Sequence, residues 1–350
     1  MLADSRAFHT ERFSRELRRQ GCRVLVASLE RGRKLHFHLR RIGPVRQLHY
    51  FLAAPQVRRL LARFRPDIVN PHFATGYGWL AARAGGRTPI VLNLWGSDIL
   101  IVPHKTPLHR EKALVALQAA AAVVADSRYL LTEAHRLVPA VSDRPHAIIP
   151  WGIEKRYLDL HKPDYAFQHP LRIIVPRTQA AIYNNQFIVE ALAPLLHRGT
   201  VAMTFPAWGP LAGRFREAVS SFPVGAVRLY ERLRREDYLR LAARHDIYLS
   251  AAGSDSSPAS LIESMGLGLL PIAADIEGVR EWLTPDSGDL FEPGRGDALR
   301  EILENLLASA DPRADLRRRN LERVQREAVF EDNVAAQLEL MRSLVREPHP

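Results

Sequence analysis

Short apolar runs alternate along the whole chain with longer stretches in which apolar residues recur at helical spacing. Five runs fall in the first half and five in the second: residues 22–29, 67–72, 89–94, 121–126 and 146–150, then 171–176, 201–206, 226–230, 246–251 and 269–274. Strands that alternate with helices are typical of a parallel sheet covered by helices. The pattern therefore predicts an α/β fold.

A polar stretch with prolines and no clear strand, residues 151–170, separates the two sets of runs. We expect a domain joint there, with a first domain over residues 1–155 and a second over 165–323. After Leu283 the pattern becomes helical, and residues 324–344 are predicted to form a terminal helix, so we expect residues 324–350 to pack back across the joint. At the other end, Met1 to Asp4 resemble the end of a strand, so we expect the true start to lie upstream.

The composition fits two such domains. At 350 residues and 47% hydrophobic content, the chain is long enough for two buried cores. Its single cysteine, Cys22, excludes an internal disulfide. The most apolar run, residues 113–125, is interrupted by Gln118 and is too short to span a bilayer. We therefore expect a cytoplasmic protein.

The charge is the unusual feature of the composition. A net charge of +11 and an isoelectric point near 10.2 predict an anionic partner, which can be a phosphate-rich ligand, nucleic acid or an acidic membrane surface. Residues 31–65 carry ten Lys and Arg and no Asp or Glu, interleaved with apolar side chains. This mixture is typical of a segment that lies on an anionic membrane surface, and the alternative is a solvated basic helix that aids solubility.

Candidate chemistry gathers directly after the strands, where ligands bind in open α/β sheets. Arg177 follows one predicted strand, and the sequence SDSSPASLIESMGLG follows another. In it Ser257 is predicted to cap a helix, with Pro258 at the first helical position, so unpaired N–H groups at the helix start favour phosphate. Asp255 and Glu263 flank this start, and their carboxylates can each accept hydrogen bonds from sugar or ribose hydroxyls.

These residues resemble the retaining GT-B glycosyltransferases of family 4. That family has two acidic residues separated by seven others, as Asp255 and Glu263 are, and Glu263-Ser264-Met265-Gly266 is similar to the sequence around the second acid. The resemblance implies two Rossmann-like domains whose parallel sheets face a central cleft. It also implies that Asp255 contacts the donor sugar, that Glu263 holds the ribose, and that Arg177, at the end of LRIIVPR, binds the donor phosphate.

The resemblance extends over nearly the whole chain and assigns further candidates. On the donor side these are Ser256, Ser257, Pro258, Ser260, Leu261, Tyr183 and Asn184, and on the acceptor side His9, Trp95, Gly96, Ser97 and Asp98, with His72 as a further catalytic candidate. The chain departs from the family in four places. Asp255 replaces the usual glutamate at the first acidic position, Ile182 replaces a phosphate-binding lysine, Trp95 replaces a histidine, and the paired glycines of the first loop are absent.

Each candidate also has a purely structural interpretation. The two acids can be a solvated pair that the helix start favours, and Arg177 can be a surface ion-pair partner. His72 can be a hydrogen-bonded residue at a strand end, and the Asp98 side chain can hydrogen-bond to the backbone of its own turn. Trp95 can be a packing residue.

The implied activity is transfer of a sugar from a nucleotide diphosphate-sugar to an acceptor hydroxyl with retention of configuration, in polysaccharide, lipopolysaccharide or glycolipid synthesis. The acceptor is expected to be lipid-linked or a glycan. No metal and no cofactor are expected, because the chain has no Asp-x-Asp pair, no GxGxxG after a strand and no GxxxxGK[ST]. A nucleotide-sugar epimerase or hydrolase on the same fold stays open as an alternative. A nucleic-acid-binding protein is disfavoured, because no OB, RRM or helix-turn-helix pattern accompanies the charge.

Overall fold

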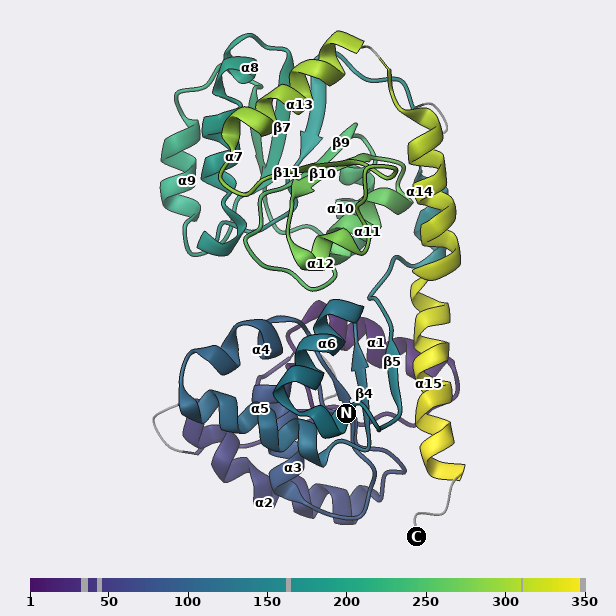
Figure 1. Ribbon diagram of the computed structural model, residues 1–350. Coiled ribbons are helices and arrows are strands. Elements are labelled where there is room, and N and C mark those ends of the chain that lie inside the picture. The colour runs from purple at the N-terminus through teal and green to yellow at the C-terminus, as the bar shows by residue number, and fades with distance from the viewer. Residues whose placement is uncertain (33–36, 43–45, 162–164, 310, 347–350) are drawn as a thin grey trace. The chain divides into compact units, whose positions relative to one another are not determined.

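The computed structural model describes residues 1–32, 37–42, 46–161, 165–309 and 311–346. By their internal contacts they divide into two compact units, one formed by Met1–Pro150 with Glu331–Pro350 and the other by Trp151–Phe330. Each unit contains parallel strands with helices packed around them (Figure 1). The predicted α/β fold with two Rossmann-like domains is confirmed.

The first unit is built on short parallel strands. Leu2 pairs with both Ala27 and Pro71, and His72 pairs with Asn93, so isolated bridges join the pair β1–β2 to the sheet β3–β4–β5. The strands are β1 (Ala27–Ser28), β2 (Phe37–His38), β3 (Val91–Asn93), β4 (Ala122–Ala125) and β5 (His146–Ile148). The helices are α1 (Phe8–Arg19), α2 (Arg46–Phe64), α3 (Trp79–Ala84), α4 (Ser97–Leu100), α5 (Pro107–Ala119), α6 (Arg128–Leu137) and α15 (Phe330–Arg346), with a π-helix at Phe73–Gly78 and 3-10 helices at Val102–His104 and Pro139–Val141.

The second unit contains one parallel sheet of six strands in the order β11-β10-β9-β6-β7-β8. In chain order this is the 3-2-1-4-5-6 arrangement of nucleotide-binding Rossmann folds. The strands are β6 (Leu171–Ile174), β7 (Val201–Pro206), β8 (Val227–Tyr230), β9 (Ile247–Ser250), β10 (Leu270–Ala274) and β11 (Asp289–Phe291). The helices are α7 (Asn185–Ala191), α8 (Ala193–His197), α9 (Ala212–Val219), α10 (Arg235–Ala242), α11 (Ala259–Gly266), α12 (Glu277–Arg280), α13 (Gly296–Ser309) and α14 (Ala314–Glu327), with 3-10 helices at Lys155–Leu160 and Ala181–Tyr183.

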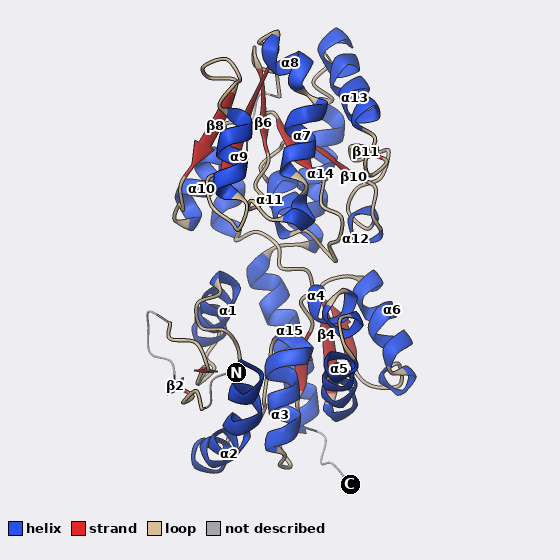
Figure 2. Ribbon diagram, turned by 90° about the vertical axis from the view of Figure 1, so that its left-hand side faces the viewer, coloured by secondary structure: helices blue, strands red, loops and turns tan. Residues whose placement is uncertain are grey.

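Successive residues of this sheet face two different cores. Ile173 packs with α7, α8, α9 and α13 on one face, whereas Ile174 packs with α10, α11 and α14 on the other (Figure 2). In β9, Leu249 packs in the same core as Ile173, and Tyr248 packs in the same core as Ile174. Because side chains alternate along a strand, a strand buried on both faces reads as the continuous apolar run seen in the sequence.

Two expectations for the end of the chain are wrong. The stretch after Leu283 is not wholly helical, because Asp289–Phe291 forms β11 at the edge of the sheet beside β10. The predicted helix over residues 324–344 is two helices, broken where the backbone of Ile153 pairs with Val329 and accepts a hydrogen bond from the N–H of Phe330. Beyond the break, α15 packs on the first unit, where the Asn333 amide donates to the Pro150 carbonyl.

Candidate functional site

Strand order in the second sheet reverses between β6 and β9, the position at which open α/β sheets bind ligands. Arg177 lies on the loop after β6 and Asp255 on the loop after β9. The Arg177 guanidinium forms an ion pair with the Asp255 carboxylate, and the two side chains are 15% and 18% exposed. The fold thus brings together two candidates that the sequence places far apart.

The Arg177 guanidinium is held against an aromatic ring. Its central carbon lies 4.8 Å from the centroid of the Tyr183 ring, a cation–π contact. Its Nε is buried without a hydrogen-bond partner among the described residues. Because an unpaired buried donor costs about 1–3 kcal/mol, a phosphate oxygen that accepts from this N–H would be bound favourably.

The loop after β6 is fastened to the loop after β9. Asn184 adopts a left-handed backbone with φ 49°, and its side-chain amide donates to the Ala251 carbonyl at 3.1 Å. The N–H of Gly253 donates to the Ile182 carbonyl at 2.8 Å. Tyr183 and Asn184 are therefore fixed beside Arg177, while Ile182, at the position of the family's lysine, exposes an apolar side chain.

Helix α11 begins one residue later than expected. Pro258 occupies the cap position in an extended conformation, with φ −63° and ψ 105°, so the first helical residue is Ala259 and no side chain caps the helix. The prediction that Ser257 caps it is wrong for this reason. The Ser257 hydroxyl is instead buried without a hydrogen-bond partner in the described part of the chain, beside Ser256, which is also buried.

Two donor-side candidates on α11 differ in their surroundings. The Ser260 hydroxyl lies in the first turn, 3.3 Å from the Tyr248 hydroxyl. Leu261 is fully buried in the core, and its N–H donates to the Pro258 carbonyl. Leu261 therefore supports the helix from inside the fold.

A glycine that follows β10 lies directly against the backbone of Asp255. At Gly278, in α12, a Cβ atom would lie 2.1 Å from the Asp255 carbonyl oxygen and 2.8 Å from Cα of Ser256. The Asp255 carboxylate also accepts from the Ser256 N–H at 3.0 Å. The backbone after β10 thus supports the loop that carries the first acid.

The second acid, Glu263, is 4% exposed and is bound by an arginine. Arg235, the first residue of α10, donates through Nη1 to Glu263 at 2.5 Å and through Nη2 to Glu154 at 2.9 Å. Neither partner was predicted from the sequence. Glu154 lies in the predicted joint, but Arg235 had no distinguishing signal, because it opens a short amphipathic helix like many surface arginines.

Two acceptor-side candidates, His9 and Trp95, form one ring cluster in the first unit with the catalytic candidate His72. The Trp95 ring lies edge-on to the His72 ring at 5.7 Å and to the His9 ring at 5.8 Å between centroids. The Trp95 indole N–H donates to Nδ1 of His72 at 3.2 Å. Trp95 therefore packs against both histidines.

His72 is held as a neutral imidazole. It is 1% exposed, and burial lowers its pKa to about 3. Since an indole nitrogen can only donate, Nδ1 of His72 is the acceptor and the ring proton is on Nε2, which donates to the Asn70 side chain at 2.9 Å. The Asn70 amide continues the network to Asn93, which pairs with Gln337 of α15. Both nitrogens of the neutral ring are therefore engaged, one by Trp95 and one by Asn70.

Asp98 joins two loops at the strand ends. Its carboxylate accepts from the Trp95 N–H at 2.8 Å and from the Ala74 N–H at 2.6 Å. Burial raises its pKa to about 6 despite these backbone bonds. Gly96 adopts φ 92° and Ser97 opens α4, so both candidates shape the turn that presents Trp95.

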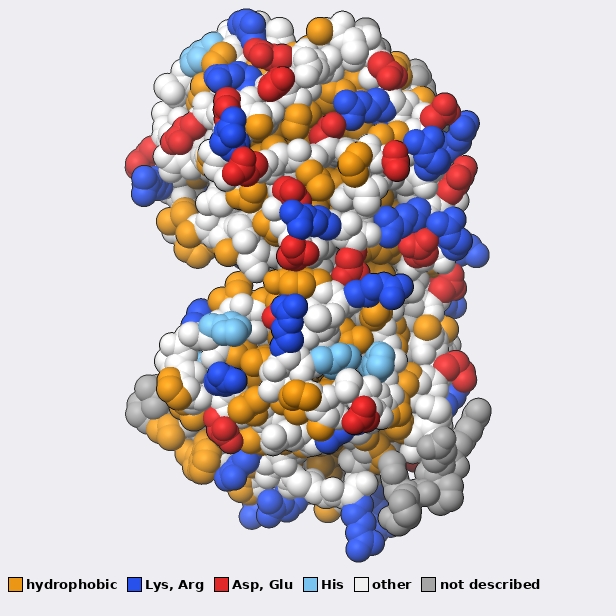
Figure 3. Space-filling view, viewed as in Figure 1, with side chains coloured by type: hydrophobic (Ala, Val, Ile, Leu, Met, Phe, Trp, Pro, Cys, Tyr) orange, Lys and Arg blue, Asp and Glu red, His pale blue; other side chains and the backbone are white. Residues whose placement is uncertain are grey.

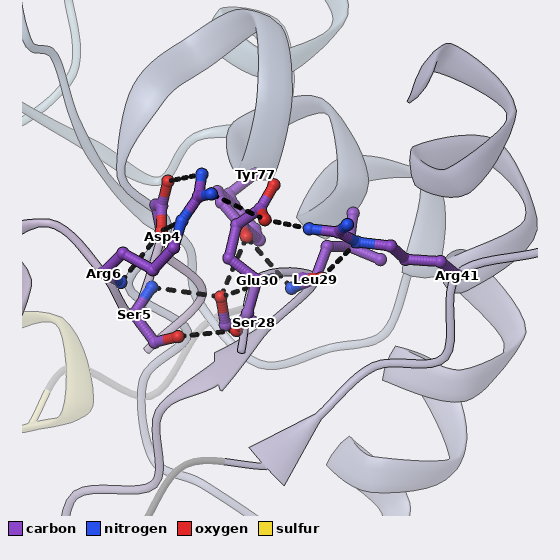
Figure 4. A network of polar contacts seen from close by, with 8 residues as sticks. All are labelled: Asp4, Ser5, Arg6, Ser28, Leu29, Glu30, Arg41 and Tyr77. Carbon is purple, nitrogen blue, oxygen red and sulfur yellow. Dashed lines mark hydrogen bonds and ion pairs between the residues drawn. The ribbon is translucent and has the colours of Figure 1, made fainter. Parts of the chain in front are cut away.

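A second polar network lies after the first strands of this unit (Figure 4). Glu30 pairs with Arg41 and, at 3.4 Å, with Arg6, which also pairs with Asp4 at 2.9 Å. Although the basic segment 31–65 contains no acidic residue of its own, the charge of Arg41 is offset by Glu30, which lies just before the segment. The remaining residues of the network are Ser5, Ser28, Leu29 and Tyr77.

Similarity to known proteins accords with this arrangement. Residues 1–127 match a family model described as glycosyl transferase 4-like, and residues 177–339 match one described as glycosyl transferase-like. TuaC of Bacillus subtilis (strain 168), named as a teichuronic acid biosynthesis glycosyltransferase, is 25% identical over 73% of this chain. The matched part spans 66% of that protein.

Solved structures share the fold at low identity. Anabaena HepE, crystallised in complex with UDP, is 16% identical with a TM-score of 0.77, and the match covers 98% of each chain. Sucrose-phosphate synthase from Thermosynechococcus elongatus is 15% identical with a TM-score of 0.79, covering 98% of this chain and 94% of that one. The two family models, which cover different parts of the chain, support a glycosyltransferase, and the solved structures show that the chain has the GT-B fold.

Proposed function

We propose that the protein transfers a hexosyl group from a nucleoside diphosphate-sugar to an acceptor hydroxyl with retention of configuration. The observation that carries this proposal is the Arg177–Asp255 pair at the switch point, beside the start of α11. In the reaction the anomeric carbon–phosphate oxygen bond breaks and a bond to the acceptor oxygen forms. The acceptor proton passes to the departing diphosphate. TuaC and HepE, whose names and titles concern teichuronic acid and UDP, support a nucleotide-sugar donor.

The donor side of the proposal needs fixed positive charge. Arg177, with its buried Nε–H, and the N–H groups at the start of α11 oppose the negative charge that grows on the leaving diphosphate. Asp255 contacts the donor sugar and Glu263 the ribose. Because these protein groups act where a divalent ion would, we propose that transfer is metal-independent.

In this proposal the first unit binds the acceptor. Trp95 presents its ring at the strand ends, held by Asp98 and His72, with His9 against its edge. We assign these residues to orienting the acceptor, and His72 acts through Trp95. A departing diphosphate that takes the acceptor proton removes the need for a protein base.

We further propose that the acceptor is lipid-linked or a membrane glycan and that the protein works on the cytoplasmic face of the cell membrane, in polysaccharide or lipopolysaccharide synthesis. Exposed apolar side chains gather within the basic segment: Phe37, Ile42, Leu48, Phe51 and Leu52. Arg33, Lys34, Leu35 and His36 lie outside the described residues. No helix in the described ranges is long and apolar enough to cross a membrane.

The exposed ring of Phe51 gives this surface a mixed basic and aromatic character. The Arg83 guanidinium lies 5.0 Å from the Phe51 ring centroid, and Phe51 packs on Trp79. In Figure 3, hydrophobic and basic side chains lie together over the part of the first unit where Figure 1 places α2. Such a surface can insert rings among lipid headgroups while its arginines attract anionic phosphates.

One experiment tests the reaction itself. Thermal shift across UDP-, GDP- and ADP-sugars identifies the donor, since a ligand at a hundred times its Kd adds about 2.7 kcal/mol of stability. Incubation of the labelled donor with and without membrane lipid extract then separates transfer from its alternative. Label that moves to lipid with retained configuration supports the proposal. Conversion or hydrolysis that is equal without acceptor favours an epimerase or hydrolase.

A further inference from the structure

Three largely buried charged residues, Arg235, Glu154 and Glu263, form a cluster beside α11. Arg235 is 13% exposed in its side chain, Glu154 10% and Glu263 6%. We infer that Arg235 is a positioning residue that fixes the Glu263 carboxylate so that its second oxygen faces the ribose of the bound nucleotide. This inference rests on the proposed function, because it needs a ribonucleotide at this site.

The guanidinium is held on two edges. Its Nε and Nη2 both donate to Oε2 of Glu154, at 3.3 and 2.9 Å, and its Nη1 donates to Oε1 of Glu263 at 2.5 Å. A planar guanidinium fixed by two donors to one carboxylate cannot rotate freely, so its third donor has a set direction. Oε2 of Glu263 accepts no hydrogen bond from the described residues, which leaves this oxygen for a hydroxyl.

Local helix preference does not explain an arginine at this position. Arg235 is the first residue of α10, where the helix dipole favours negative charge, and the acidic residues Glu236 and Asp237 follow it. Burial opposes the charge on Arg235, but the negative charges of Glu263 and Glu154 outweigh burial and raise its pKa. The two glutamates therefore hold this buried arginine as a cation.

One guanidinium faces two carboxylates in this cluster, and Arg235 binds Oε1 of Glu263 through Nη1 while Nη2 binds Glu154. An ionised carboxylate is an acceptor only and forms stronger hydrogen bonds than a neutral group. Glu263 is thereby suited to accept from the two adjacent ribose hydroxyls, and Arg235 should contribute to selection of ribonucleotides over nucleotides that lack them.

The test compares each nucleotide with its counterpart that lacks both ribose hydroxyls. UDP, GDP and ADP are first titrated calorimetrically into the wild-type protein. The nucleotide that binds is then compared with its 2′,3′-dideoxy form in Arg235→Ala, Arg235→Lys and Glu154→Gln. We expect the wild type to prefer the ribonucleotide at least tenfold, Arg235→Ala to lose this preference with little change in dideoxynucleotide affinity, and Arg235→Lys to recover part of it. Glu154→Gln should lose part of the preference.

Arg234→Ala is the matched control, because Arg234 precedes Arg235 but its side chain is 88% exposed and pairs only with Asp237 in the described chain. Its ribose preference should equal that of the wild type. An unchanged preference in folded Arg235→Ala would overturn the inference while leaving the proposed function intact. Should that variant fail to fold, unchanged preferences in both Arg235→Lys and Glu154→Gln overturn it. If no nucleotide binds the wild type, the proposed function fails first and this inference falls with it.

Discussion

Arg177 and Asp255 form an ion pair at the edge where the strand order of the second sheet reverses. Neither loop contains both residues, so the pair exists only because β6 and β9 are neighbours in the sheet. A donor phosphate brought to this edge meets a guanidinium that already has one carboxylate partner and one buried N–H that no described residue accepts from. Arg177 can therefore bind phosphate through Nε–H while Asp255 fixes its orientation.

Replacing Arg177 tests its role in donor binding. Arg177→Ala should lower donor affinity and kcat together, each by about tenfold or more, because diphosphate charge is present in the ground state and grows in the transition state. Steady-state kinetics and donor titration check this. Arg172→Ala is the control, because Arg172 is an exposed arginine on β6, the strand before Arg177, and it should leave both values unchanged. Unchanged binding and turnover in Arg177→Ala would assign the phosphate to another residue.

Gly278 offers a test of Asp255 without altering any side chain that contacts the donor. Gly278→Ala should reduce turnover at least tenfold, because the new methyl group would lie 2.1 Å from the Asp255 carbonyl and must displace that loop. Gly213→Ala in α9 is the matched control, since its Cβ meets nothing within 4 Å and alanine favours the helix. Equal activity in the two variants would show that the position of the Asp255 loop does not matter.

Metal independence has a direct test. Transfer should proceed at the same rate after thorough dialysis against EDTA, because in the proposed reaction Arg177 and the N–H groups of α11 stabilise the leaving diphosphate in place of a metal ion. Initial rates with EDTA, magnesium and manganese are the measurement. Loss of activity with EDTA that magnesium or manganese restores would contradict the proposal.

The buried His72 predicts a specific dependence of stability on pH. Its folded-state pKa of about 3 lies below the unfolded value near 6.5, so below pH 6.5 only the unfolded chain binds the proton. The free energy of unfolding should fall by about 1.4 kcal/mol per pH unit between these values on account of His72. Asp98 has the opposite effect on the free energy of unfolding. Its raised pKa lets the folded state bind a proton as pH falls through about 6, and this proton binding adds stability.

The contribution of His72 can be separated by substitution. His72→Gln should destabilise the protein at pH 7 but lose less stability than the wild type between pH 7 and pH 5, as measured by thermal unfolding at both pH values. His104→Gln, at an exposed position, should follow the wild type. If His72→Gln and the wild type lose equal stability, His72 is not held neutral by the fold.

Membrane binding is predicted to depend on exposed arginines of the basic segment. Arg40, Arg59 and Arg63 are exposed, whereas Arg41 pairs with Glu30 and Arg58 donates to the Ala84 carbonyl, so the first three can be changed with least effect on the fold. Arg40→Glu, Arg59→Glu and Arg63→Glu together should weaken binding to phosphatidylglycerol vesicles about a hundredfold or more, since each basic residue contributes about 1 kcal/mol.

The same experiment has an internal control. Arg214→Glu, Arg216→Glu and Arg319→Glu make the same change of net charge at exposed positions of the second unit and should leave vesicle binding less affected. Raising the salt concentration should release the wild type, and donor binding should survive in both triple variants. If vesicle affinity changes neither with salt nor with either set of substitutions, the basic segment is not the membrane-binding surface.

The sequence by itself determined the class of fold and the places where chemistry gathers. Residues buried on both faces of a strand form continuous apolar runs, so the central strands of both sheets could be predicted from the chain. The short edge strand Asp289–Phe291 escaped prediction because only its pairing with β10 defines it. The break between α14 and α15 escaped for the same reason, since it depends on Ile153.

Only the tertiary structure decided which candidates meet and what state they are in. Strand order places Arg177 beside Asp255, and packing of α10 against α11 places Arg235 beside Glu263. No local periodicity encodes these distances. Burial and hydrogen-bond partners, which also come from distant segments, make His72 a neutral ring that holds Trp95. Local pattern fixes which faces of an element are apolar, whereas the charge and direction of a polar side chain depend on neighbours that the fold supplies.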